Sequence, residues 1–205
     1  MLVVGHSVLV PTPAAAATPL GMVAPGTYPL EVYKFGQPQS GTLRVTDSGS
    51  YQQTYNLPDG RIALTLAQST NLLSPTDVML TNLEIFGIFF NPTTPKLYRP
   101  LNVLGVMLPG ATWEWQMTSG NGNVGLRWSA RNAGVEVLFD DAGLPVVTQR
   151  IDSTLRFSGS ASGTVQHTRW EALATPTRAI DHFAGPVTLN GTQYHVDSWA
   201  AAGGM

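Results

Sequence analysis

Two of the four histidines in the chain stand beside aspartates and are candidates for metal or acid–base chemistry. His182 follows Asp181, and His195 lies two residues before Asp197, so His195 and Asp197 share one face if this segment is a strand. A hairpin turn at Asn190-Gly191 could bring the two imidazoles and two carboxylates together as metal ligands. Their spacing matches no zinc signature. We therefore favour surface histidines near a C-terminal sheet edge and predict no metal site.

A third histidine lies within "TVQHTRWEAL", residues 164–173. Alternation places His167, Arg169 and Glu171 on one face of a strand and Trp170 on the other. A histidine near a carboxylate can act as a general acid/base pair. We favour a simpler interpretation, a row of solvated polar side chains in which Arg169 and Glu171 form an exposed pair worth under about 1 kcal/mol.

Other catalytic patterns are missing from the sequence. There is no Gly-x-Ser-x-Gly motif, and "SGSASG" at 158–163 has the composition of a turn. Asp140-Asp141 lacks the further carboxylates of a calcium loop and is interpreted as a hairpin turn. The absence of cysteine excludes disulfides and thiolate chemistry. We predict no catalytic residue and no cofactor, and we favour a non-enzymatic protein over an enzyme that uses His167 or the His182/His195 region.

Composition limits the partners. Of the 205 residues, 43% are hydrophobic and only 12% are charged, and the net charge is −2 with no block of Lys or Arg. We therefore predict no nucleic-acid partner and a surface rich in Ser, Thr, Asn and Gln. No run of about 18 apolar residues exists, so we predict no transmembrane segment.

The N-terminus, "MLVVGHSVLVPTPAAAATPL", combines a short apolar run, prolines and an Ala15-x-Ala17 pattern. This resembles a bacterial signal peptide, although no basic residue precedes the apolar run. We predict a signal-like or flexible arm over 1–24, a single antiparallel β domain over 25–205, and a secreted or cell-envelope location.

Period-two alternation is the main structural signal. In 111–118, Trp113, Trp115 and Met117 alternate with polar residues, and 123–131 repeats the pattern after a Gly-Asn-Gly turn. Similar alternation marks 51–57, 61–66 and 147–157. Each segment has one polar face, which is typical of antiparallel sheets with one solvated side.

We therefore predict an all-β fold, a large curved antiparallel meander of about nine to eleven strands that is half-barrel or barrel-like. Segments 64–73 and 78–90 are dense enough in apolar residues for short helices at most. The apolar face is covered either by the sheet closing on itself or by segments 83–90 and 101–108 lying across its concave side.

The tryptophans suggest where a ligand would bind. Trp113, Trp115 and Trp128 fall on the apolar faces of two adjacent strands, where they form a core or line a cavity for a hydrophobic molecule. With Phe89 and Leu108 from the covering segments, they form our predicted ligand-binding set.

The stretch "RPLNVLGVMLPGATWEW" leads from a Pro-rich connection through Pro-Gly-x-x-Trp into a hairpin. It resembles uncharacterised secreted proteins of actinobacteria. The outline of the chain is similar to the LolA-like lipoprotein carriers and their mycobacterial lipid-binding relatives. This resemblance implies a half-barrel that carries lipid or acyl chains. The alternative is a structural or protein-interaction module with a closed core and no small ligand.

Overall fold

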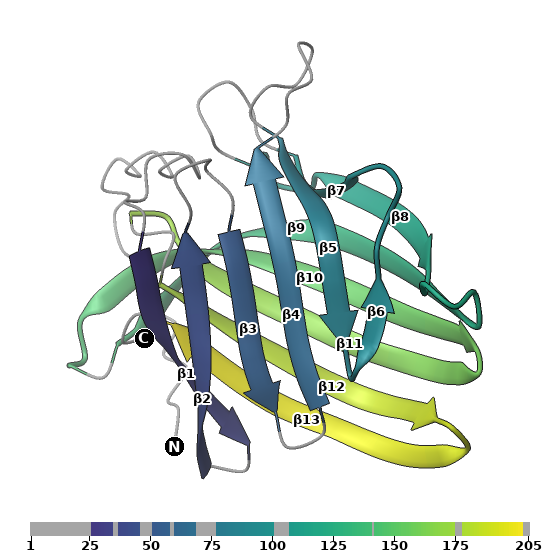
Figure 1. The fold of residues 1–205 in the computed structure, drawn as a ribbon. Helices are drawn as coiled ribbons and strands as arrows, with labels where there is room; N and C mark the ends of the chain where they lie inside the picture. The colour runs from purple at the N-terminus through teal and green to yellow at the C-terminus, as the bar shows by residue number, and fades with distance from the viewer. Residues whose placement is uncertain are drawn as a thin grey trace.

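The computed structural model describes residues 26–34, 37–45, 51–57, 60–68, 77–100, 107–140, 142–174 and 178–202 (Figure 1). These residues form thirteen strands and no helix, so the predicted all-β class is confirmed, with more strands than expected. No helix long and apolar enough to cross a membrane occurs in these ranges.

The strands follow one another along the chain with short connections, apart from those between β4 and β5 and between β7 and β8. They are β1 (Gly26–Lys34), β2 (Gln37–Val45), β3 (Tyr51–Leu57), β4 (Gly60–Gln68), β5 (Val78–Ile85), β6 (Ile88–Phe90), β7 (Lys96–Arg99), β8 (Thr112–Thr118), β9 (Val124–Phe139), β10 (Pro145–Gly159), β11 (Ala161–Ala172), β12 (Ala179–Leu189) and β13 (Thr192–Ala202).

The sheet is antiparallel throughout and is folded over into two facing layers. Its strand order is β6-β5-β4-β3-β2-β1-β13-β12-β11-β10-β9-β8, and β7 pairs with β5 next to β6. In Figure 1, β1–β6 lie in front of β8–β13, and the two layers are joined where β1 pairs with β13. On the opposite side no ladder joins β8 to β6 or β7 among the described residues, so the sheet is not closed into a barrel. We call this open side the seam.

The second layer covers the tryptophan-bearing layer, so the sheet closes over itself. Residues 83–90 belong to β5, β6 and the turn between them, and are part of this layer rather than a separate cover. Segment 64–73 likewise begins in a strand, β4, and its residues 69–73 lie outside the described residues. In the segment predicted at 101–108, residues 101–106 lie outside them as well, while Met107 is buried and Leu108 is exposed.

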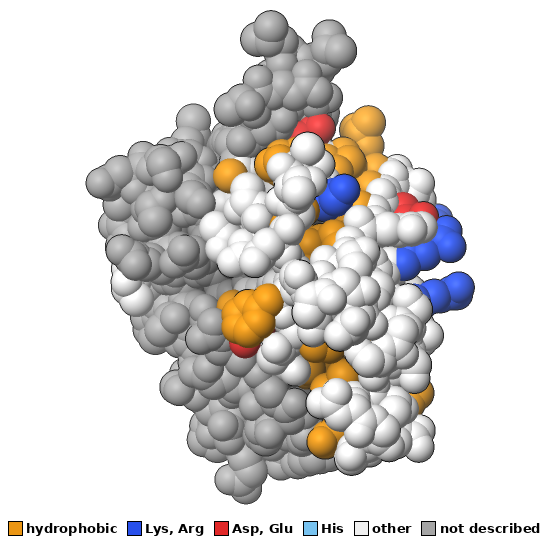
Figure 2. All heavy atoms as spheres, turned by 45° about the vertical axis from the view of Figure 1, so that its right-hand side comes forward, with side chains coloured by type: hydrophobic (Ala, Val, Ile, Leu, Met, Phe, Trp, Pro, Cys, Tyr) orange, Lys and Arg blue, Asp and Glu red, His pale blue; other side chains and the backbone are white. Residues whose placement is uncertain are grey.

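The interior contains the alternating residues that the sequence indicated. Trp113, Trp115 and Met117 of β8 are buried, and the intervening residues are exposed. Leu126 and Trp128 of β9 are buried in the same core cluster. In Figure 2 the described part of this side of the molecule is mostly uncharged polar side chains and backbone, with hydrophobic side chains exposed between them and a few charged ones at the right.

Two predicted turns are confirmed. Asn190 and Gly191 both have positive φ, 49° and 79°, as a tight hairpin turn with right-handed twist requires. In the β9–β10 turn the Asp140 carboxylate accepts hydrogen bonds from the amides of Leu144 (2.8 Å) and Ala142 (3.0 Å). The bond from Leu144, with help from Arg178, holds the pKa of Asp140 below its ordinary value.

Candidate functional site

The three predicted tryptophans meet inside the folded sheet. The rings of Trp115 and Trp128 lie 5.1 Å apart, and Tyr98 of β7, in the opposite layer, contacts Trp128 edge-on at 6.0 Å. A void of about 10 Å³ remains beside Trp113 and Trp128. That is room for about one water molecule, so side chains fill the space along this part of the tryptophan wall.

The other two residues of the predicted ligand-binding set lie apart from the tryptophans. Phe89 is 53% exposed and borders a hollow of about 400 Å³ at the turn end of the layers, beside Phe86 and Val124. Leu108 is 61% exposed, and its carbonyl accepts a hydrogen bond from the Asn132 side chain at 2.8 Å.

The polar face of β11 points into the interior, which contradicts the predicted solvated row. His167, Arg169 and Glu171 are all buried, whereas Trp170 points to the outer face and is only partly covered. The expected exposed Arg169–Glu171 pair is therefore wrong. The physical reason is the register of the sheet. His167 lies directly between Ser153 of β10 and Phe183 of β12, which both face the interior, so this face of β11 is buried with them.

Asp181 of β12 connects the buried side chains. Its Oδ1 lies 2.8 Å from His167 Nε2, and its Oδ2 accepts a hydrogen bond from Arg169 Nη1 at 2.7 Å. Arg169 Nε donates to Glu171 Oε2 at 3.1 Å. We call these four side chains the interior polar network. Hydrogen bonds between ionised partners are among the strongest in proteins, and in this network the buried guanidinium is bonded to two carboxylates.

The two ring nitrogens of His167 have different surroundings. Because a carboxylate only accepts hydrogen bonds, the bond to Asp181 places a proton on Nε2. The ring stacks on Phe183 at 4.4 Å, and Nδ1 has no hydrogen-bond partner in the described part of the chain. An imidazole oriented by a carboxylate, with its second nitrogen free, is the arrangement of a general base. The void of about 10 Å³ that His167 lines is too small for a substrate larger than water in this conformation.

Sequence reasoning missed that Asp181 is the partner of His167. A usable signal was present, since Asp181 alternates in phase with the buried Phe183 and Val187 of its strand, and His167 alternates in phase with Val165.

A second histidine–aspartate pair lies on the outer face. His182 Nε2 is 2.9 Å from Asp197 Oδ1, and the His182 ring stacks on Trp199 at 3.9 Å. His195 is exposed on β13, as predicted for a surface histidine, but the predicted sheet edge is wrong, because β13 pairs with β1 on one side and β12 on the other. Asp181 points inward, so the four groups considered as metal ligands do not converge. No set of three potential His, Cys, Asp or Glu ligands gathers within the described ranges.

An ionic cluster on the same outer face involves Arg150. Its guanidinium donates to Asp152 at 2.8 Å and to Glu136 at 3.0 Å, and these carboxylates, Asp152 first, raise the Arg150 pKa. Glu136 also accepts a hydrogen bond from the Trp170 indole at 2.8 Å. These groups hold one another in place across β9, β10 and β11. Their charged and hydrogen-bonding atoms are therefore already engaged with one another.

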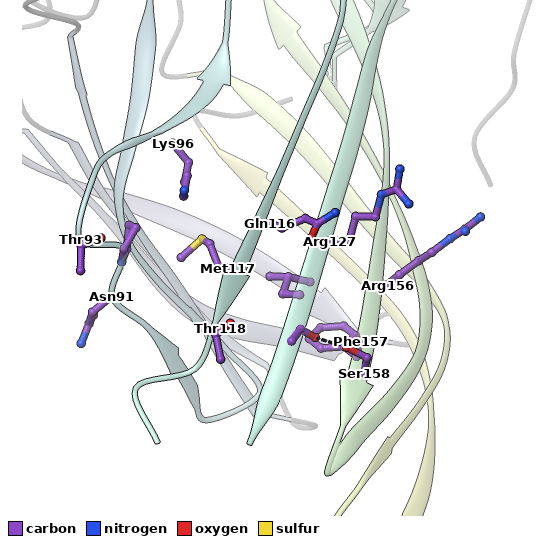
Figure 3. A pocket seen from close by; sticks show the side chains of 13 residues that line it. Asn91, Thr93, Lys96, Gln116, Met117, Thr118, Arg127, Arg156, Phe157 and Ser158 are labelled. Carbon is purple, nitrogen blue, oxygen red and sulfur yellow. Dashed lines mark hydrogen bonds between the residues drawn. The ribbon is translucent and has the colours of Figure 1, made fainter. Parts of the chain in front are cut away.

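A hollow of about 600 Å³ lies at the seam, between the β6–β7 connection and strands β8–β10 (Figure 3). Figure 3 shows Lys96 pointing toward the hollow, while the guanidinium groups of Arg127 and Arg156 point away from it. Met117 and Phe157, two residues of the core cluster, form part of its wall. The seam hollow therefore borders both solvent and the apolar interior.

Together these features define an open, folded-over antiparallel sheet with a polar network inside it and a hollow at its unpaired side. Comparison with protein-family models, curated proteins and solved structures found no match. The resemblance to LolA-like carriers therefore stays a prediction.

Proposed function

We propose that the protein binds an amphipathic small molecule, an acyl chain with an anionic head, at the seam hollow. The observation that carries this proposal is a hollow of about 600 Å³ at the seam, where no ladder joins β8 to β6 or β7 in the described ranges. That volume lies within the range of small-molecule sites, which are typically 300–1,000 Å³.

The lining suits a molecule with two unlike ends. Lys96 supplies a positive charge directed toward the hollow, and no ion pair of Lys96 occurs among the described residues. Asn91 and Gln116 add hydrogen-bonding groups, and Met117 and Phe157 offer apolar contact. An anionic head would lie near Lys96, and the chain would follow the wall toward the interior.

The tryptophans have an indirect role in this proposal. Trp115 of β8 pairs with Trp128 of β9. The next inward-facing pair on the same two strands is Met117 and Leu126. They form the packed wall behind the hollow, rather than the contact surface itself. The ligand therefore remains hydrophobic, as the sequence suggested, but its site moves from the centre of the concave face to its rim.

Isothermal titration calorimetry with dodecanoate as the ligand tests the proposal. We expect binding by the wild-type protein and about three- to tenfold weaker binding by Lys96→Met, because one charge-assisted contact is lost. Arg131→Met removes an exposed cation from β9, away from the hollow, and should leave the affinity unchanged. Dodecanol should bind wild type and Lys96→Met equally.

A variant that fills the hollow provides a second test. Thr118 is exposed and lines it, so Thr118→Trp should abolish dodecanoate binding without unfolding the protein. No binding by wild-type protein, or equal losses in Lys96→Met and Arg131→Met, would count against the site.

A second candidate is a structural or interaction module with a closed core. The 10 Å³ void beside the tryptophans favours it, because the interior is filled there. A native mass without bound lipid, together with unquenched tryptophan fluorescence in the presence of acyl probes, would support this alternative.

We also propose export to the cell envelope or beyond, supported by the signal-like composition of residues 1–24, which lie outside the described residues. N-terminal sequencing of the protein recovered from a bacterial host tests this. A mature chain starting shortly after Ala17 supports export, and an uncleaved intracellular chain opposes it.

A further inference from the structure

We infer that the void beside His167 binds one small molecule with a hydroxyl group. In aqueous solution this molecule is water. This inference does not depend on the proposed ligand at the seam. It follows from the size of the void, from the polar atoms around it and from their burial.

The size of the void matches one molecule. Its volume of about 10 Å³ is close to the minimum of roughly 10–15 Å³ that a buried water needs. It is lined by Tyr98, Trp113, Trp128, Ile151, Ser153, His167 and Arg169. A methyl-bearing or larger ligand would have to displace these side chains.

Two polar atoms of the lining residues have no partner. His167 Nδ1 and Trp113 Nε1 have no hydrogen-bond partner among the residues that the structure describes, and both residues are more than nine-tenths buried. Leaving such a group unpaired costs about 1–3 kcal/mol, so native interiors rarely do so without an ordered water. Ser153 adds a hydroxyl to the same wall.

The hydrogen-bonding pattern selects a molecule that both donates and accepts. With the Nε2 proton directed to Asp181, Nδ1 of the neutral imidazole is an acceptor, while the Trp113 indole is a donor. Water satisfies both at once, and it also satisfies an imidazolium by accepting twice. Once bound, it links Trp113 of β8 through His167 to Asp181 and Arg169 and thus connects the tryptophan wall with the interior polar network.

Water cross-relaxation in the NMR spectrum of the full-length protein tests the site. We expect a water cross-peak at the Trp113 indole proton, with the sign of a long-lived buried water. Trp115 is a matched internal control, because its Nε1 is also buried and unpaired but Trp115 does not line the void. No cross-peak at Trp113, or equal ones at both indoles, would overturn the inference.

A void-filling variant gives an independent readout. Ser153→Val should remove the Trp113 cross-peak and shift the ¹⁵N resonance of His167 Nδ1, while Ser129→Val on the outer face of β9 should change neither. Persistence of the cross-peak in a folded Ser153→Val protein would contradict the site. If that variant does not fold, Trp113→Phe removes the donor and should move the same His167 resonance, whereas an unmoved resonance would overturn the inference.

Discussion

Two histidine–aspartate pairs lie on opposite faces of β12, and their differences show how burial changes one chemical contact. Asp181 and His182 are consecutive residues, so one points inward and the other outward. The inner pair, His167–Asp181, has a 2.8 Å contact and side chains 3% and 4% exposed, whereas the outer pair, His182–Asp197, has a 2.9 Å contact and side chains 26% and 46% exposed. Both imidazoles stack on an aromatic ring.

The His–Asp distances in the two pairs are nearly the same, but this does not mean that the two pairs contribute equally to the free energy of unfolding. Water and salt screen the outer pair, so its contribution to stability should be small. The inner pair is cut off from water, and Arg169 is tied to the same aspartate. Removing Asp181 takes one carboxylate from the buried Arg169 and the hydrogen-bond partner from His167, which should cost much more than removing one member of the exposed pair.

The largest effect is expected for Asp181→Ala. The substitution leaves Arg169 and His167 without the carboxylate they share, so we expect the free energy of unfolding to fall by about 3–5 kcal/mol. Urea unfolding followed by tryptophan fluorescence measures this value. A loss below about 1 kcal/mol would place the inner pair in the same class as the outer one.

His167→Phe should have a smaller effect. The new ring keeps the stacking on Phe183, and Asp181 keeps Arg169, so only the imidazole hydrogen bond is lost, at about 1–3 kcal/mol. His182→Phe is the matched control on the outer face and should change the unfolding free energy by less than about 1 kcal/mol. Equal losses for the two variants would contradict the proposed difference.

Asp197→Ala tests the outer pair from its acidic side. We expect a loss under about 1 kcal/mol at low salt that shrinks further at about 1 M NaCl, because exposed charges are screened there. The effect of Asp181→Ala should persist at both salt concentrations. A salt-independent Asp197→Ala effect would show that the outer pair is effectively buried.

The smallest effect concerns Asp140, a carboxylate stabilised by backbone amides instead of a histidine. Its folded-state pKa is depressed below the ordinary 3.8, so its contribution is present above that value and is lost as the pH falls through it toward the folded pKa. Asp140→Asn keeps an acceptor for the Leu144 amide but removes this pH dependence. The urea midpoint of wild type and variant, compared between about pH 5 and pH 3, measures the difference; parallel curves would contradict it.

The fold was predictable from sequence because several strands alternate strictly. In β8 every apolar residue falls on one face, and the face assignment of Trp113, Trp115 and Met117 follows directly. In β11, by contrast, the buried face carries three polar residues beside Val165, and the other face carries Trp170 among polar residues. Alternation therefore identified the strand, but the side-chain types assigned its faces the wrong way round.

The site was less predictable, because it depends on contacts between distant strands. Alternation says nothing about which layer covers which face, and so it could not place Tyr98 against Trp128 or Asp181 between His167 and Arg169. The seam hollow arises from the missing ladder beside β8, a property of the strand order that no local pattern encodes.

The strand order also bears on how the chain assembles. Strands β1–β7 and β8–β13 are each one continuous stretch of sequence built from neighbouring hairpins, and such local pairings form quickly. The ladder that joins the halves pairs their most distant strands, from Leu30 opposite Ala202 to Tyr33 opposite Trp199. Two polypeptides divided between Pro100 and Met107 would each retain a complete meander, and the β1–β13 ladder would give them a register in which to reassociate.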